Sequence, residues 1–291
     1  MTQQIGMIGI GLMGHGIARN VLKHGFPLAV MDHPGNRPLD ELRAAGVHVR
    51  ASAAEVAADA DVVILCVTGS PQVEAVLTGA GGVLETLRPG AIVVDCSTSI
   101  PSSTERMAGV VAEKGGRFVD APMTRLAKHA HEGTLNLLVG GDPAVLAEVR
   151  GLLDAFSENV THVGPVGAGH RMKLLHNYVS LGFMTLLAEA AAHAERAGVA
   201  PEVLIDVLAQ GGGAGAALQR LTPFMRTRDA SDVPFFISNA AKDLGYYRET
   251  AGEAGVRHEI ADVVGRTLEG LVTAGHGQDY MPALVELLKA G

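Results

Sequence analysis

The sequence predicts an α/β fold in which a mostly parallel sheet with flanking helices precedes an all-helical C-terminal domain. From the start to about residue 165, short apolar runs alternate with helical stretches, a pattern typical of βαβ units. After Gly164-Pro165-Val166-Gly167 the strand-like runs stop, and apolar residues recur at helical spacing almost to the end. We therefore expect two domains, residues 1–165 and 166–291.

The strands of the first domain are expected where short apolar runs lie between clusters of turn residues. These runs are Ile5–Ile10, Leu28–Met31, Val62–Val67, Ala91–Val94 and Leu135–Val139. Proline is tolerated in the first turn of a helix, because the N–H that it lacks has no partner there. Helices are accordingly expected to open at Pro71, Pro101 and Pro143.

The second domain is expected to be built on one long helix. Residues Arg171–Ala197 contain no proline or convincing cap and would extend over about 40 Å. The segment is strongly apolar, but charged and polar residues interrupt it, so no membrane span is predicted. We expect it to join the two domains and to be covered further by another subunit in a homodimer or homotetramer.

Composition and charge limit the class of protein. Hydrophobic residues make up 47% of the 291 residues and charged residues 19%, which is typical of a globular protein. The net charge of -8 disfavours nucleic acid as a partner. Cys66 and Cys96 lie in apolar runs, and no secretory signal precedes the first strand, so a reduced, cytoplasmic protein is expected. The 12 histidines show no zinc-ligand spacing, and no metal is predicted.

A glycine-rich turn follows the first expected strand and opens a helix. In such a turn one glycine makes the bend, one lets the backbone approach a pyrophosphate, and one lets helix and strand pack closely. The pattern predicts a Rossmann domain that binds a dinucleotide through Gly9, Gly11, Leu12, Met13 and Gly14.

The ribose end of the dinucleotide is expected at the next strand. Asp32 lies 18 residues after Gly14, where a carboxylate can accept hydrogen bonds from a ribose diol. A carboxylate there repels a 2′-phosphate, which favours NAD. Arg37 in the same loop could reach such a phosphate, so NADP is kept as the alternative.

Four separated motifs resemble the β-hydroxyacid dehydrogenase family, the family of 3-hydroxyisobutyrate dehydrogenase and tartronate semialdehyde reductase. The likeness covers nearly the whole chain and rests on the extended glycine turn, Asp120-Ala121-Pro122-Met123, Gly167-x-Gly169-x-x-x-Lys173-x-x-x-Asn177 and Lys242-Asp243-Leu244. The resemblance implies NAD(P)-dependent interconversion of a small β-hydroxy acid and its semialdehyde or ketone. It also implies a catalytic Lys173, a substrate-orienting Asn177, and cofactor contacts from Thr68, Thr98 and Lys242.

The third motif also has a physical reading of its own. Lys173 and Asn177 are four residues apart on the expected helix, so they share one face and can reach the same ligand. When hydride attacks a carbonyl, an alkoxide develops. A lysine ammonium beside that oxygen stabilises the charge and donates the proton, and its neutral form accepts a proton in the opposite direction.

The substrate loop departs from the family pattern. Where the family usually has a serine and two glycines, this chain has Thr124-Arg125-Leu126. Thr124 can replace the serine hydroxyl, and an arginine at this place resembles the sulfolactaldehyde reductase branch. The guanidinium fork suits bidentate pairing, so Thr124 and Arg125 are expected to bind a small substrate with a distal carboxylate, sulfonate or phosphonate. The alternative is that Arg125 points to solvent.

Other proteins of this architecture provide competing interpretations. An imine reductase typically lacks the catalytic lysine, whereas Lys173 is present. A non-catalytic nucleotide-binding sensor or assembly protein could keep the glycines without the lysine–asparagine pair. A 6-phosphogluconate dehydrogenase is disfavoured because the expected helical part is short for that enzyme.

Overall fold

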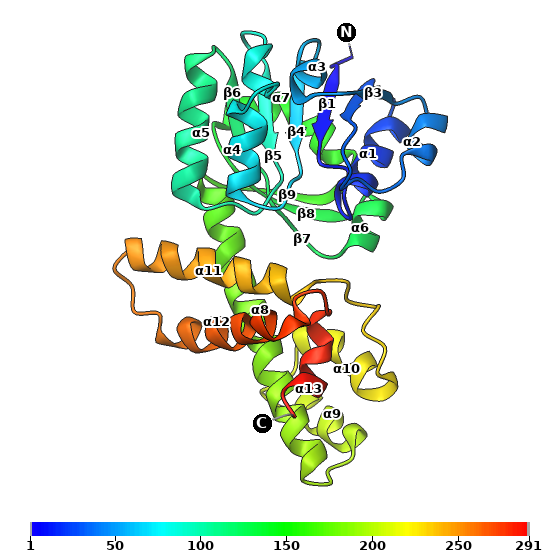
Figure 1. The fold of residues 1–291 in the computed structure, drawn as a ribbon, viewed down its shortest axis with the longest axis vertical. Helices are drawn as coiled ribbons and strands as arrows, with labels where there is room; N and C mark the ends of the chain where they lie inside the picture. Colours follow the sequence, from blue (N-terminus) through cyan, green and yellow to red (C-terminus); the bar gives the residue numbers. More distant parts are fainter. Residues whose placement is uncertain (1, 290–291) are drawn as a thin grey trace. The chain divides into compact units, whose positions relative to one another are not determined.

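The computed structural model describes residues 2–289 and divides into two compact units, one ending at Lys173 and the next beginning at Leu174. Strands occur in the first unit and helices make up the second, so the predicted order of an α/β part and a helical part is confirmed (Figure 1). The division falls inside helix α8 (Ala168–Arg196), a continuous helix of 29 residues. This is the long helix that the sequence predicts, and it begins three residues earlier than expected.

The first unit is built on one nine-stranded sheet in the order β3-β2-β1-β4-β5-β6-β8-β7, with β9 paired to β8. The strands from β3 to β6 are parallel, whereas β8 is antiparallel to β6 and β7. The strand order reverses between β1 and β4, and α/β sheets bind ligands at the carboxyl ends beside such a reversal. The strands are β1 (Ile5–Ile8), β2 (Leu28–Met31), β3 (His48–Arg50), β4 (Val62–Leu65), β5 (Ile92–Asp95), β6 (Arg117–Asp120), β7 (Met123–Thr124), β8 (Leu135–Gly140) and β9 (Ser157–Gly164).

Two of the predicted strands extend too far. The first ends at Ile8 instead of Ile10, because Gly9 has a φ of +97° and turns the chain away from the sheet. The strand predicted to end at Val67 ends at Leu65, and the N–H of Val67 donates to the Ser97 hydroxyl instead of to a neighbouring strand. In both places an apolar run continues past the last strand residue into the following turn.

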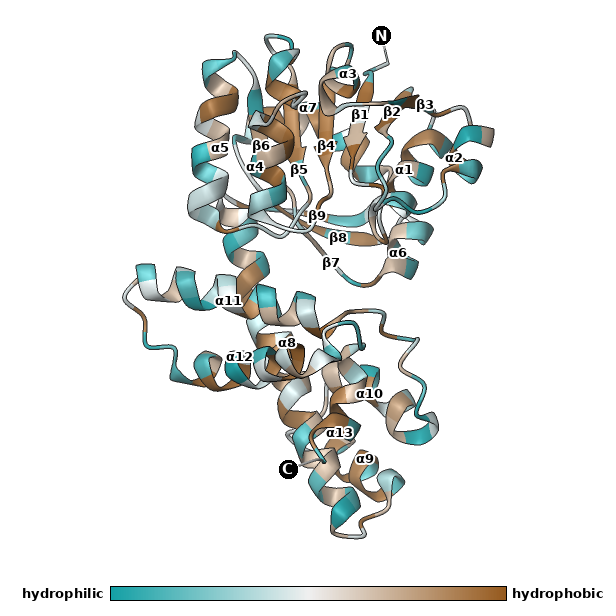
Figure 2. Cartoon of the chain, in the orientation of Figure 1, coloured by the Kyte–Doolittle hydropathy of each residue, from teal (hydrophilic) through white to brown (hydrophobic). Residues whose placement is uncertain are grey.

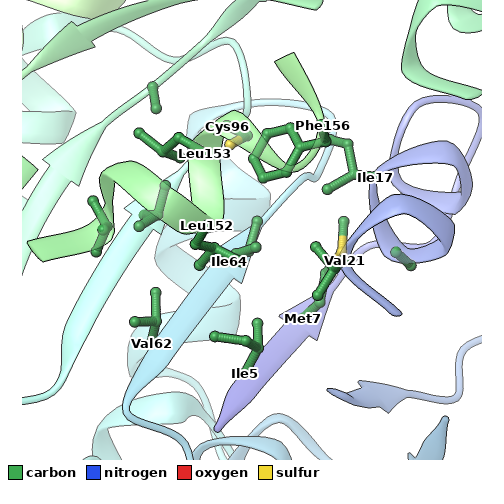
Figure 3. Packing of buried hydrophobic residues seen from close by; sticks show 14 of the residues in the cluster. Ile5, Met7, Ile17, Val21, Val62, Ile64, Cys96, Leu152, Leu153 and Phe156 are labelled. Atoms are coloured by element: carbon green, nitrogen blue, oxygen red, sulfur yellow. The ribbon is translucent and has the colours of Figure 1, made fainter. Parts of the chain in front are cut away.

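Helices cover both faces of the sheet and make two apolar layers. One layer packs side chains of α1 and α7, such as Val21 and Leu152, against Met7 and Ile64 of the strands (Figure 3). The other layer packs α3, α4 and α5 against the opposite face. Figure 2 shows that the central strands β1, β4 and β5 are mostly hydrophobic and that the helices around them are of mixed character. The helices are α1 (Gly14–Lys23), α2 (Asp40–Ala44), α3 (Ala53–Ala57), α4 (Ser70–Thr78), η1 (Val83–Glu85), α5 (Pro101–Glu113), α6 (Ala127–Glu132) and α7 (Pro143–Asp154).

The second unit has its own apolar core around the later turns of α8. Side chains from α9, α10, α11, α12 and α13 pack there against Leu181, Met184 and Leu187. Within the described part of the chain, no helix combines the length and apolarity needed to cross a bilayer. The remaining elements are α9 (Pro201–Ala209), α10 (Ala216–Thr227), α11 (Ile237–Glu253), α12 (Glu259–Leu271), η2 (Val272–His276), η3 (Met281–Ala283) and α13 (Leu284–Leu287).

Candidate active site

The glycine turn after β1 has the geometry that a pyrophosphate requires. A Cβ atom at Gly9 would lie 2.2 Å from the Cys66 carbonyl oxygen, and one at Gly14 would lie 1.9 Å from the Gly9 carbonyl oxygen. Any side chain at these two positions would therefore push strands and helix apart. A Cβ atom at Gly11 would meet nothing within 4 Å, which leaves the backbone open to a ligand. The three glycines thus fit the three roles of the dinucleotide turn.

The first turn of α1 faces this opening. The helix begins at Gly14, and no side chain caps it at Met13. Leu12 and Met13 are both half-buried. Backbone N–H groups of an uncapped helix start carry partial positive charge and bind anions. The turn from Gly9 to Gly14 can therefore hold the phosphates of a dinucleotide.

The loop after β2 carries Asp32 at its start. Asp32 and Arg37 are both exposed in this loop. The Asn36 side chain ties the loop to the glycine turn, because its Oδ1 accepts from the Ile10 N–H at 3.3 Å and its Nδ2 donates to the Met31 carbonyl at 2.8 Å. The sequence analysis missed Asn36, whose role depends on residues that are distant along the chain. With both charges exposed, the loop is compatible with NAD and with NADP.

Two threonines follow the neighbouring strands. Thr68 comes after β4 and is exposed, and Thr98 comes after β5 and is half-buried. The Ser97 hydroxyl joins their turns by accepting from the Val67 N–H at 3.0 Å. Since β1, β4 and β5 are adjacent and parallel, the glycine turn and both threonines lie at the same edge of the sheet.

Lys173 reaches the predicted substrate loop within the first unit. Its Nζ donates to the Met123 carbonyl oxygen at 2.7 Å. Met123 precedes Thr124 in β7, and Thr124 is buried with 8% of its surface exposed. Two motifs that are 50 residues apart in sequence therefore meet at this hydrogen bond.

Arg125 adopts a backbone conformation that usually favours glycine. Its φ is +79°. Its Nη1 donates to the Thr134 carbonyl oxygen at 2.6 Å and is ion-paired with the Glu158 carboxylate. Among the residues that the structure describes, no hydrogen bond to Nε or Nη2 is formed. The side chain is thus anchored at one edge of its guanidinium and does not extend freely into solvent.

In the second unit, Asn177 belongs to a polar cluster on α8 and α11. Its Nδ2 donates to Asp243 Oδ2 at 2.6 Å, and its Oδ1 lies 3.0 Å from His176 Nδ1. The Lys242 ammonium lies 3.0 Å from Asp243 Oδ1. A carboxylate only accepts hydrogen bonds, so Asp243 fixes which end of the Asn177 amide faces it. The sequence analysis gave Asp243 no role, although it lies inside the lysine motif.

The two cysteines lie close to these turns but are poor nucleophiles. Burial raises the pKa of Cys66 to about 12 and raises the pKa of Cys96 well above its usual range. Both side chains are therefore neutral thiols at physiological pH, and thiolate chemistry is not expected. In residues 2–289, no group of three or more histidine, cysteine, aspartate or glutamate residues could hold a metal ion.

Comparisons with known proteins cover both units. Residues 4–164 match the family model of the NAD binding domain of 6-phosphogluconate dehydrogenase, and residues 167–288 match the model described as NAD-binding of NADP-dependent 3-hydroxyisobutyrate dehydrogenase. The NAD-dependent L-serine dehydrogenase of Pseudomonas aeruginosa is 35% identical over 86% of this chain and 85% of its own length. The 2-(hydroxymethyl)glutarate dehydrogenase of Eubacterium barkeri is 32% identical over 98% of this chain and 94% of its own.

A solved structure of similar fold agrees with these matches. The 3-hydroxyisobutyrate dehydrogenase of Mycobacterium tuberculosis, determined with L-serine, superposes with a TM-score of 0.88 at 27% identity. The alignment covers 100% of both chains. The similarity therefore extends over the nucleotide-binding part and the helical part.

Proposed function

This chain belongs to the β-hydroxyacid dehydrogenase family, and from that premise we propose that it interconverts a small β-hydroxy acid and its semialdehyde or ketone, with NAD or NADP as cofactor. The observation that carries the proposal is the contact of Lys173 with the Met123 carbonyl, beside Thr124. It supports a catalytic ammonium directed at the substrate loop.

Residues of this chain donate and accept the proton that accompanies hydride transfer. When bound, the nicotinamide supplies the hydride to the carbonyl carbon or takes it from the alcohol. Lys173 donates a proton to the developing alkoxide in reduction, and its neutral amine accepts one in oxidation. Asn177, one helical turn further along α8, orients the substrate through its amide, which Asp243 holds in place.

Binding of the cofactor is assigned to the carboxyl ends of the strands. The turn from Gly9 to Gly14 holds the pyrophosphate, and Asp32 accepts hydrogen bonds from the ribose. Thr68, Thr98 and Lys242 provide the remaining cofactor contacts. The open backbone at Gly11 supports this assignment.

The substrate is proposed to carry a distal anionic group, a carboxylate, sulfonate or phosphonate, beside Thr124. The anion pairs with Arg125 through the guanidinium edge formed by Nε and Nη2. The bonds of Nη1 to Thr134 and Glu158 support this use, because they hold the opposite edge and fix the plane of the fork. Bidentate pairs of this kind are among the stronger hydrogen-bonded contacts.

A panel of carbonyl compounds tests the proposal. Purified protein is given NADH and then NADPH with succinic semialdehyde, tartronate semialdehyde, sulfolactaldehyde, a phosphonate ketone, an uncharged aldehyde and a cyclic imine, and loss of reduced cofactor is followed. We expect the reduced cofactor to be oxidised while at least one anionic semialdehyde or ketone is reduced. Turnover of the imine alone would identify an imine reductase, and cofactor binding without any turnover would identify a non-catalytic binder.

A further inference from the structure

A fully buried imidazole in the helix that carries Lys173 contacts one of the proposed cofactor turns. His170 is in the first turn of α8 and has 0% of its surface exposed. Its Nε2 lies 3.2 Å from the Ser97 carbonyl oxygen, and its Nδ1 lies 2.8 Å from Thr104 Oγ1. A carbonyl oxygen only accepts, so Nε2 donates to Ser97. The ring therefore joins α8 to the turn after β5 and to helix α5.

The contact with Ser97 links His170 to both threonine turns. Ser97 precedes Thr98, and its hydroxyl accepts from the Val67 N–H, next to Thr68. A shift of the His170 ring would therefore also displace the turns after β4 and β5.

The contact with Thr104 holds the ring in either protonation state. A threonine hydroxyl donates to Nδ1 when the imidazole is neutral and accepts from it when the imidazole is charged. Two buried carboxylates lie nearby, with Asp95 Oδ2 3.9 Å from Nε2 and Asp120 Oδ2 3.7 Å from Nδ1.

Asp120 fixes the start of the same helix to the sheet. Its Oδ1 accepts from the Gly167 N–H and its Oδ2 from the His170 N–H, each at 2.8 Å. A carboxylate at a helix N-terminus satisfies N–H groups that have no partner inside the helix. A Cβ atom at Gly169 would lie 2.4 Å from the Leu138 carbonyl oxygen, so the first turn rests directly on the strand backbone.

The position of the Lys173 ammonium depends on how this first turn is rotated. Residues three apart on a helix lie on the same side, so His170 and Lys173 turn together. A rotation that moved Lys173 Nζ away from the Met123 carbonyl would also pull His170 from Ser97 and Thr104. This inference rests on the proposed role of Lys173. We propose that His170 is a positioning residue, which holds the catalytic ammonium in register with the substrate loop and the cofactor turns.

Three variants test the role of His170. His170→Leu keeps a similar volume and removes both hydrogen bonds, His170→Gln can keep both, and Thr104→Val removes the bond at Nδ1 alone. A displacement of about 1 Å can reduce a rate on the order of 100-fold, so His170→Leu and Thr104→Val should lower kcat by about 10- to 100-fold. His170→Gln should recover most of the loss. The solvent deuterium isotope effect on kcat should rise in the slow variants, because proton transfer by a displaced lysine becomes rate-limiting.

Thr185→Val is the matched control for Thr104→Val. Thr185 is a buried helical threonine whose hydroxyl lies 2.9 Å from the Leu181 carbonyl oxygen, four residues earlier, and the Thr104 hydroxyl lies 3.2 Å from the Ile100 carbonyl oxygen in the same way. Its replacement should leave kcat, the NADH dissociation constant and the substrate KM near wild type.

Two results would overturn the inference. One is a kcat for Thr104→Val equal to that of Thr185→Val. The other is a His170→Gln variant as slow as His170→Leu. Lys173→Ala distinguishes failure of this inference from failure of the proposed function. An active Lys173→Ala variant would contradict the proposed function. An inactive Lys173→Ala variant together with fully active His170 variants would contradict only the positioning role of His170.

Discussion

At the scale of single residues, Arg125 combines a backbone typical of glycine with a cationic side chain. A left-handed residue other than glycine costs about 1–2 kcal/mol. The φ of +79° at Arg125 is accompanied by the hydrogen bond to Thr134 and the ion pair with Glu158, which offset part of that cost. The loop thus keeps a shape that glycine would adopt and adds a positive charge.

Replacing Arg125 separates the charge from the shape of the loop. Asparagine tolerates a left-handed backbone, so Arg125→Asn removes the guanidinium with little added strain. We expect kcat/KM for an anionic semialdehyde to fall by about 10- to 100-fold, as for loss of a charge-assisted pair. A neutral aldehyde of similar length serves as the control substrate. An equal fall on both substrates would mean that Arg125 only supports the loop.

Replacing Asp32 tests the ribose site. Asp32→Ala should weaken NAD binding by roughly 1–3 kcal/mol, because a charged acceptor is lost, and should narrow the difference from NADP. Asp40→Ala, an exposed aspartate in α2, is the matched control. Cofactor fluorescence titration measures both dissociation constants. Unchanged NAD affinity in the Asp32 variant would exclude this residue from the ribose contact.

The sequence predicted Lys173 and Asn177 as site residues because their spacing of four residues on one helix is visible in the sequence itself. Their partners were not predictable in this way. Asp243 is 66 positions from Asn177, and Thr104 is 66 positions from His170. No local pattern reports a contact over that separation, since it exists only once the sheet and helices are assembled.

At the scale of elements, the strands that the sequence predicted are the mostly apolar ones. Strands β1, β2, β4, β5 and β8 are of this kind. Strand β3 has three residues, two of them basic, and β6 begins with Arg117 and ends with Asp120. Strand β9 exposes several polar side chains, as expected of a strand outside the central path of the sheet. Polar strands gain their stability from pairing with neighbours, which periodicity does not report.

Helix α8 carries an apolar stripe that the described residues leave exposed. Met172, Leu175, Val179 and Leu186 are 41%, 45%, 67% and 62% exposed and recur at spacings of three, four and seven residues. Such spacing places them along one side of the helix. We propose that a second copy of the chain covers this stripe in a homodimer or homotetramer.

A charge in the stripe tests this proposal. Val179→Lys should shift the protein toward monomers in sedimentation velocity, because burying an unpaired ammonium in an apolar contact is costly. Ala75→Lys adds the same charge at an exposed position of α4 and should leave the assembly unchanged. An unaltered oligomer in the Val179 variant would contradict the proposed interface.

At the scale of the whole molecule, α8 is continuous through the division between the two units. Lys173 ends the first unit and Asn177 lies in the second, so the helix itself sets their spacing. We propose residues 1–165 as the nucleotide-binding domain and 166–291 as the helical domain. The two family models support this, because one ends at residue 164 and the next begins at residue 167.

The buried carboxyl of Asp95 should make the stability of the protein depend on pH. Burial raises its pKa from 3.8 to about 6, and its Oδ2 has no hydrogen-bond partner among the described residues. Between these pH values the folded protein keeps a proton that the unfolded chain has released. This group therefore makes the free energy of unfolding fall as pH rises from about 4 to 6, by up to roughly 3 kcal/mol.

Asp95→Asn removes this titration and can keep the acceptor for the Ser97 N–H. Urea unfolding at pH 4.5 and 7.5 should show a smaller loss of stability toward neutral pH in the variant than in wild type. Asp59→Asn, an exposed aspartate, is the control. The same pH dependence in all three proteins would contradict the raised pKa of Asp95.

The central claim is that Lys173 transfers the proton in a hydride-transfer reaction, and turnover by Lys173→Ala tests it most directly. General acid–base catalysis typically contributes about 100- to 10,000-fold, so the variant should lose that much kcat on the best substrate. Its affinity for reduced cofactor should stay close to wild type, because the glycine turn and Asp32 are intact. Lys114→Ala, at an exposed lysine after α5, should be fully active. A Lys173→Ala variant that keeps more than about a tenth of the wild-type rate would contradict the account.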